Sequence, residues 1–182
     1  MTREKIYTRA GDDGTTGLFY GGRVGKDSAL PRAYGAVDEA QAILGLVRAE
    51  AGKGTELDDI LVHICRDLWV LMAELATLPE NRHKLVGGKS LVTAEMVTHL
   101  EELIDSLDER FTPPTDFVVP GQNKVAALLD VGRTVARRAE RHSLAAAPAP
   151  SQACPYLNRL SDLLWTLARW QDGVSLPVKD VI

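Results

Sequence analysis

Four arginines lie close together in the segment 132–142 (GRTVARRAERH), within a pattern of apolar residues that has the period of an α-helix. Because four residues advance only about 40° around a helix axis, Arg133, Arg137 and Arg141 form one row along its surface, with Glu140 at the edge. Stacked positive charges repel one another, so this row needs acidic partners or an anionic ligand. Two interpretations are open: surface ion pairs, which contribute only about 0–1 kcal/mol each, or a site that binds a polyanion.

A second group of candidate residues lies in the segment 7–17 (YTRAGDDGTTG). Its glycines are three residues apart with threonines between them, so backbone N–H groups and hydroxyls can come close to a phosphate. The Gly-Lys-Ser or Gly-Lys-Thr ending of a Walker A motif is absent. The segment is therefore either a phosphate-binding loop of another kind or a flexible arm. Lys26, a little further on, either reaches a phosphate or is simply exposed.

Other polar and aromatic residues have two interpretations each. Asp38 lies outside the main apolar face of its predicted helix, where it is either solvated or faces the arginine row in a buried ion pair. Phe117, in the short extended piece 116–121, is either a core residue or an aromatic side chain held over the mouth of a pocket. The last predicted helix carries a second polar face, formed by Asn158, Asp162, Trp165 and Arg169.

Helical spacing of apolar residues predicts the elements that must position these groups. We expect five helices, at about 31–50, 56–78, 93–110, 123–144 and 157–170. Residues 1–30 are expected to form a glycine-rich arm with at most a short strand around Ile6 and Tyr7, and residues 173–182 a loose tail. With no internal repeat and no second domain, the predicted fold class is all-α: a five-helix bundle, residues 31–172, preceded by the arm.

The composition excludes several classes of protein. The chain has 182 residues, 45% of them hydrophobic, and a net charge of −4. A negatively charged chain is not attracted to nucleic acid or to an anionic membrane, so neither is expected as a partner. Its two cysteines form neither a disulfide framework nor a zinc pattern, and no residues are predicted to be metal ligands. No apolar run approaches the ~20 residues that span a bilayer. No secretory leader is seen, so we expect a cytoplasmic protein.

Five segments, taken together and in this order, resemble the PduO-type ATP:cob(I)alamin adenosyltransferases over nearly the whole chain. They are 8–17 (TRAGDDGTTG), 34–39 (YGAVDE), 117–121 (FVVPG), 133–141 (RTVARRAER) and 157–162 (LNRLSD). The resemblance implies a homotrimer of five-helix bundles, with ATP bound at subunit interfaces and wrapped by the arm. It also implies that the cobalt of cob(I)alamin attacks the 5′ carbon of ATP with the help of Mg²⁺, giving adenosylcobalamin and inorganic triphosphate.

The resemblance also implies roles for individual residues. Asp38 and Arg133 would form a salt bridge that shapes the corrinoid site. Phe117 would press on the lower face of the corrin ring and keep the dimethylbenzimidazole base away from cobalt. ATP would be held by Arg137, Arg138, Glu140 and Asn158 together with the arm residues Thr8, Arg9, Gly11, Asp12, Gly14, Thr15 and Thr16.

The chemistry of such a transfer fits these residue types. Triphosphate leaves readily only if its developing charge is neutralised, which a metal ion and the cations Arg137 and Arg141, with Arg9 or Lys26 from the arm, can do. Because Co(I) is itself the nucleophile, no protein nucleophile is needed, and the sequence offers no convincing Ser-His-Asp or Cys-His set. The expected partners are a reductase, such as a flavoprotein, that makes cob(I)alamin from cob(II)alamin, and an adenosylcobalamin-dependent enzyme that takes the product.

The chain differs from the family pattern mainly on the corrinoid side of the site, at Gln122, Asp130 and Gly132 and in the pair Ala40-Gln41. Two other functions are therefore kept open. The first is a non-catalytic protein, such as a chaperone or sensor, that binds ATP or a corrinoid. The second is a plain helical scaffold whose arginines form surface ion pairs.

Overall fold

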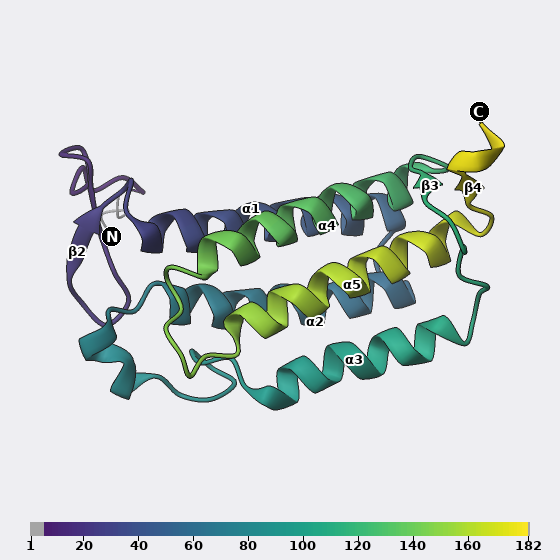
Figure 1. Cartoon of the computed structure of the whole chain (residues 1–182). Coiled ribbons are helices and arrows are strands. Elements are labelled where there is room, and N and C mark those ends of the chain that lie inside the picture. The colour runs from purple at the N-terminus through teal and green to yellow at the C-terminus, as the bar shows by residue number, and fades with distance from the viewer. Residues whose placement is uncertain (1–5, 182) are drawn as a thin grey trace.

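The described part of the computed structural model, residues 6–181, contains five α-helices that lie along one another in a bundle (Figure 1). Helix α1 packs mainly on α4 and α2, α4 on α5, and α3 on α5. The predicted five-helix bundle is thereby confirmed. The bounds of the helices are Ala29–Ala51 for α1, Glu56–Leu75 for α2, Ala94–Asp108 for α3, Lys124–Ser143 for α4 and Ala153–Asp172 for α5.

Helix α4 lies at the centre of these contacts because its inward face is apolar and small. Asn123 begins the helix by accepting a hydrogen bond from the Ala126 N–H (2.9 Å) and donating one to the Gln171 carbonyl of α5 (2.7 Å). A Cβ added at Gly132 would lie 3.4 Å from a methyl group of Leu44, an ordinary van der Waals contact, so α1 packs closely against α4 at this position. The core side of α4 is completed by Leu129, Val135, Ala136 and Ala139.

The N-terminal arm differs from the prediction only in part. Ile6 and Tyr7 are exposed and lie outside any strand, which agrees with an arm expected to contain at most a short strand there. A short antiparallel hairpin forms further on, from β1 (Thr15–Gly17) and β2 (Arg23–Gly25), with Thr16 opposite Val24. Side-chain hydrogen bonds, such as those from Arg23 to the Thr15 hydroxyl, stabilise this hairpin. The spacing of apolar residues does not predict such bonds. Residues 1–5 of the predicted arm lie outside the described residues.

The C-terminal segment is also more ordered than predicted. After α5, Gly173 turns the chain with φ of 70°. Strand β4 (Leu176–Pro177) then pairs antiparallel with β3 (Val118–Val119), and a single 3₁₀ turn, η2 (Val178–Asp180), follows. The prediction of a loose tail is therefore wrong for residues 174–181. The remaining helical element is a 3₁₀ helix, η1 (Pro79–Lys84), in the connection between α2 and α3.

The two pairs of strands mark opposite ends of the bundle: β1 and β2 lie at one end and β3 and β4 at the other (Figure 1). Helix α4 begins beside β3 and runs toward the end that carries β1 and β2. Its arginine row, from Arg133 to Arg141, therefore extends for about 12 Å along the bundle. Among residues 6–181, no helix combines the length and apolar character that crossing a bilayer requires.

Candidate functional site

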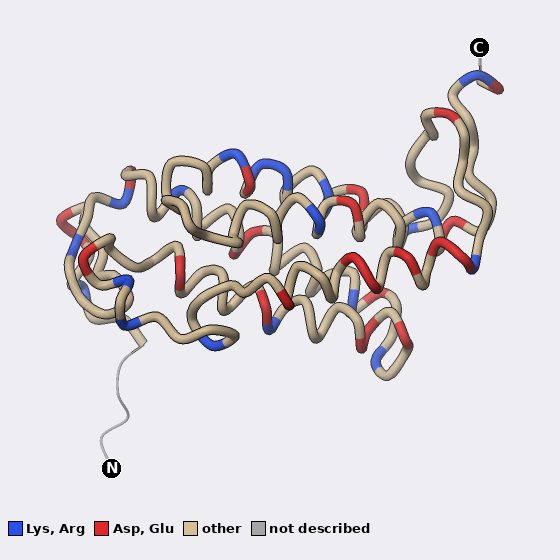
Figure 2. Tube along the Cα trace, turned by 60° about the horizontal axis from the view of Figure 1, so that its bottom comes forward, with Lys and Arg blue, Asp and Glu red and all other residues tan. Residues whose placement is uncertain are grey.

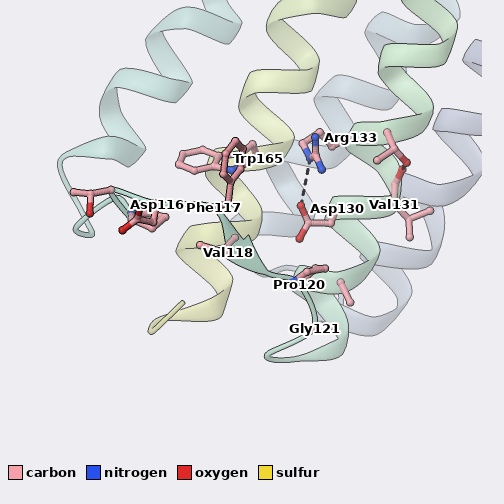
Figure 3. A pocket seen from close by; sticks show the side chains of 13 residues that line it. Asp116, Phe117, Val118, Pro120, Gly121, Asp130, Val131, Arg133 and Trp165 are labelled. Atoms are coloured by element: carbon pink, nitrogen blue, oxygen red, sulfur yellow. Dashed lines mark hydrogen bonds and ion pairs between the residues drawn. The ribbon is translucent and has the colours of Figure 1, made fainter. Parts of the chain in front are cut away.

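A pocket of about 880 Å³ opens at the β3 end of the bundle, between the segment 114–121 and helices α4 and α5 (Figure 3). Such a volume is typical of sites for small molecules and cofactors, which fall at about 300–1,000 Å³. Phe117 lies on the pocket wall with 90% of its surface exposed, so its interpretation as a core residue is wrong. The wall also includes Asp130, Val131, Arg133 and Trp165.

A chain of charged groups lies at one side of this pocket. The Nε of Arg133 donates to the Oδ1 of Asp130 (3.3 Å), as Figure 3 shows, and the Nη2 of Arg169 donates to the Oδ2 of the same aspartate (2.7 Å). Arg169 also lies 3.1 Å from Asp172, measured from Nε to Oδ2. Burial raises the pKa of Asp172, while the guanidinium of Arg169 opposes that shift. Of these four charged side chains, those of Arg169 and Asp172 lie in the core of the bundle.

Arg169 corrects the predicted second polar face of α5. Its side chain is only 1% exposed, so it belongs to the core and not to a solvated face with Asp162. The partners that make burial tolerable, Asp130 and Asp172, were not recognised as its partners in the sequence. Asp130 is 39 residues away, and no local pattern joins the two.

The salt bridge expected between Asp38 and Arg133 is not formed within this chain. Asp38 is exposed on α1 and has no ion pair with Arg133, whose carboxylate partner is Asp130. The residue next to it, Glu39, pairs instead with Arg138 of α4. The two helices thus bring their charged residues together, but in different pairs from those predicted.

The arginine row is only partly neutralised by carboxylates. The Arg137 guanidinium is exposed and has no hydrogen bond or ion pair with any described residue, and Arg141 donates only to the backbone carbonyl of Arg137 (3.0 Å). Beside them, Asn158 of α5 donates to Glu140 (3.3 Å). Figure 2 shows Lys and Arg positions recurring along the upper edge of the bundle, where α4 lies, and at the β1–β2 end. The row can therefore accept an anion, which a set of closed ion pairs could not.

The candidate residues of the arm gather in one loop around the hairpin. The Lys26 ammonium donates to the Gly11 carbonyl (2.6 Å), and Arg23 donates to the Thr15 hydroxyl (2.6 Å). The Asp13 carboxylate accepts from both the N–H and the hydroxyl of Thr15, which lowers its pKa. Asp13 was not among the predicted site residues, although it lies within the glycine-rich stretch.

The backbone of this loop explains several of its residue types. A Cβ at Gly11 would lie 2.9 Å from the Thr15 carbonyl oxygen, and Gly14 has φ of 81°. Arg9 also adopts a positive φ, 61°. The other predicted residues of the loop make local contacts: Thr8 accepts from the Ala10 N–H (3.3 Å), the Asp12 N–H donates to the Arg9 carbonyl (3.3 Å), and the Thr16 hydroxyl donates to the Gly17 carbonyl (3.4 Å).

Sequence comparisons place the chain among enzymes of known activity. Residues 6–171 match the profile of the family described as cobalamin adenosyltransferase. The chain is 40% identical over 171 residues to a corrinoid adenosyltransferase of Citrobacter freundii, covering 92% of this chain and 95% of the relative. It is also 40% identical over 185 residues to a corrinoid adenosyltransferase of Mycobacterium tuberculosis, covering 98% and 92%.

Solved structures agree with these relatives. A variant PduO-type ATP:corrinoid adenosyltransferase from Lactobacillus reuteri, complexed with cobalamin and ATP, superimposes with a TM-score of 0.85 at 28% identity, covering 97% of each chain. Another variant of that enzyme, complexed with ATP, gives 0.81 at 27% identity, covering 94% of this chain and 99% of the other. The chain belongs to the cobalamin adenosyltransferase family and has its ATP:corrinoid adenosyltransferase activity, which confirms the resemblance seen in the sequence.

Proposed function

We propose that this protein works as a homotrimer that transfers the 5′-deoxyadenosyl group of ATP to the cobalt of cob(I)alamin. The corrin ring would lie in the pocket beside Phe117, and ATP would lie along the arginine row under the arm. A Co–C bond forms at the 5′ carbon, the C–O bond to the triphosphate breaks, and triphosphate leaves with the electron pair. The observations that carry this proposal are the exposed phenyl ring on the wall of a large pocket and, further along α4, the Arg137 and Arg141 guanidinium groups, which have no carboxylate partners among the described residues.

On the corrinoid side, Phe117 is the residue that acts on coordination. An aromatic ring against the lower face of the corrin would keep the dimethylbenzimidazole base from cobalt. A four-coordinate cobalt is easier to reduce to Co(I), because the axial ligand that favours the higher oxidation state is absent. The cofactor-like substrate thus supplies the nucleophile, and the protein supplies geometry and exclusion of water. Trp165 and the Asp130–Arg133 pair would form the opposite wall.

On the nucleotide side, the arginine row would bind the triphosphate. Arg137 and Arg141 would contribute charge-assisted hydrogen bonds from α4, and Arg138 would join them after exchanging its contact with Glu39. Glu140 and Asn158, which are hydrogen-bonded to each other, would contact the nucleoside. The arm would close over ATP through Thr8, Arg9, Gly11, Asp12, Gly14, Thr15, Thr16 and Lys26.

A single chain does not bring these two halves together. The β1–β2 loop and the Phe117 pocket lie at opposite ends of the bundle (Figure 1). Asp38 is exposed, with Arg133 bound elsewhere. A site between neighbouring copies would combine the arm of one chain with the pocket of another and would give Asp38 an arginine partner. We therefore propose the trimer and divide each chain into an arm (1–30), a bundle (31–172) and a C-terminal segment (173–182).

Mg²⁺ fits this site as a companion of the ATP phosphates. The described residues contain no group of three or more His, Cys, Asp or Glu side chains that could hold a metal ion. Mg²⁺ is commonly bound by substrate phosphates and water with only one or two carboxylates, so such a cluster is not required. When bound, the ion would neutralise charge on the departing triphosphate. A reductase, for example a flavoprotein, would supply cob(I)alamin, and an adenosylcobalamin-dependent enzyme would use the product.

The proposal is tested by an anaerobic assay with chemically reduced cobalamin and MgATP. We expect one adenosylcobalamin and one inorganic triphosphate per turnover. The two products are measured by the visible spectrum and by chromatography. Binding of ATP without a Co–C product would support the non-catalytic alternative. Absence of ATP binding in equilibrium dialysis would support the scaffold alternative. Sedimentation measurements give the oligomeric state, where a monomer that is fully active would contradict the shared site.

A further inference from the structure

Phe117 lies at the pocket wall without packing that would fix its position. Its side chain is 90% exposed, so the ring is not held by a surrounding core. On its C-terminal side the chain soon turns at Gly121, whose φ of 107° suits glycine. The segment that carries Phe117 must therefore be held through its main chain or through neighbouring residues.

The residues 174–181 supply those contacts. Val118 and Val119 pair with Pro177 and Leu176 in the β3–β4 ladder. The N–H of Val178 donates a hydrogen bond to the carbonyl of Phe117 itself (2.8 Å).

An ion pair adds to these backbone contacts, because Lys179 bonds to Asp116, the residue before Phe117. Consecutive residues of the 116–119 segment are thus each contacted from the same side.

The segment 174–181 has little apolar anchoring of its own. Val174 and Val181 are largely exposed, and Leu176 and Val178 are more than a third exposed. Its position is instead set where it leaves α5, through the turn at Gly173 and a hydrogen bond from the Ser175 hydroxyl to Asp172 (3.4 Å). A segment with so little buried surface contributes little to the hydrophobic core. Its main structural effect is therefore to hold the residues 116–119 that it contacts.

We propose that the segment 174–181 positions Phe117 over the corrinoid pocket, and that Val178 is a positioning residue that acts through its main-chain N–H. The inference rests on the proposed role of Phe117 in making cobalt four-coordinate. Without the segment, the ring is free to leave the lower face of the corrin, and the dimethylbenzimidazole base competes for cobalt. ATP binding, which uses the other end of the arginine row, does not depend on it.

The sharpest test is Val178→Pro. Proline has no N–H, so this variant removes the hydrogen bond to Phe117. It fits the backbone, because Val178 is the first residue of a 3₁₀ turn and the preceding Pro177 already has the extended conformation (φ −66°, ψ 141°) that proline requires before it. Val178→Ala is the matched control, because it removes the side chain and keeps the N–H. A chain that ends at Gly173 removes all the contacts at once.

The measurements are the fraction of cob(II)alamin that becomes four-coordinate with MgATP, kcat, KM for cobalamin and Kd for ATP. Loss of one net hydrogen bond predicts that Val178→Pro lowers the four-coordinate fraction and kcat by about 2- to 10-fold, whereas Val178→Ala stays near the unaltered protein. The truncated chain should fall to the level of Phe117→Ala. Kd for ATP should remain within about twofold in all of them.

The proposal is overturned if Val178→Pro and the truncated chain both keep the original four-coordinate fraction and kcat. If the truncated chain does not show a cooperative thermal transition, Val178→Pro decides alone. Hydrogen exchange separates this inference from the proposed function, because it needs no corrinoid. The peptide 114–121 should exchange faster in the truncated chain than in the full chain, and equal rates contradict the positioning role even in a protein that makes no adenosylcobalamin.

Discussion

Replacement of the buried arginine, Arg169→Met, should lower the free energy of unfolding strongly, although methionine is similar to arginine in size. The guanidinium bonds to Asp130 at 2.7 Å and lies 3.1 Å from Asp172, and the Asp172 side chain is fully buried. Methionine fills a similar volume but leaves the buried Asp172 without its cation and Asp130 with Arg133 alone. Removing one partner of a buried ion pair costs about 3–5 kcal/mol, and in a domain of this size each kcal/mol lowers Tm by roughly 2–4 °C.

The loss should also depend on pH. Burial raises the pKa of Asp172 in the folded protein, so the folded state holds its proton more tightly than the unfolded state does. The stability that protonation of this group contributes is therefore fully present below the unfolded pKa, about 4, and is lost as pH rises through the higher folded pKa. Without Arg169 the folded pKa rises further. The cost of the substitution should be larger at pH 8 than at pH 5.

Arg159→Met is the matched control for this experiment. Arg159 lies on the same helix and donates to Glu101 at the same distance, 2.7 Å, but its side chain is 41% exposed. An exposed pair contributes only about 0–1 kcal/mol. Urea unfolding at pH 5 and pH 8 measures both variants. If Arg169→Met loses less than about 1 kcal/mol at pH 8, or loses the same amount at both pH values, the reasoning about the buried carboxylates is refuted.

Three more outcomes follow from the site and its helix. Phe117→Ala should keep ATP binding, measured by calorimetry, but should slow anaerobic adenosylation more than about tenfold. Arg137→Ala should weaken ATP binding by about 10- to 100-fold, because charge-assisted hydrogen bonds contribute about 1.5–3 kcal/mol. Equal loss of both functions in the two variants would contradict the assignment. The glycine-rich residues 1–30 should become resistant to protease with MgATP, because ordering would accompany binding, and unchanged cleavage at saturating nucleotide would count against this closure. Gly132→Ala should raise stability by up to about 1 kcal/mol, because the added Cβ meets its nearest neighbour at 3.4 Å and a mid-helix glycine is unfavourable; a lower Tm would show that α1 and α4 cannot accommodate it.

The helices were predictable because their signal is local. Apolar residues three and four apart define α4 within one residue at each end, as Lys124–Ser143 against an expected 123–144. The arginine row follows from the same periodicity, so its direction along the helix could also be predicted. The glycines of the arm were also predictable from local requirements. Gly11 occurs where a Cβ would clash, and Gly14 where φ is positive.

The parts that were missed depend on contacts between distant residues. The tail was predicted to be loose because it has no periodicity, yet Val178 donates to a carbonyl 61 residues earlier, at Phe117. The spacing within α5 assigns Arg169 to a polar face, but its partner Asp130 belongs to another helix, which that spacing does not report. In both cases the sequence contains the residue types but not the pairing, since pairing is decided by how the helices pack.

Arg133 shows how one prediction can depend on chain packing and on assembly together. Its Nε is used by Asp130, which is itself shared with Arg169, but its two terminal nitrogens have no hydrogen-bond partner among the described residues. Arginine offers five N–H donors in a planar fork, so a second carboxylate can bind there without displacing the first. Asp38 of a neighbouring copy could therefore pair with Arg133 while Asp130 keeps the guanidinium at the wall of the pocket. The intrachain pair and the predicted pair are compatible because they use different edges of the same guanidinium.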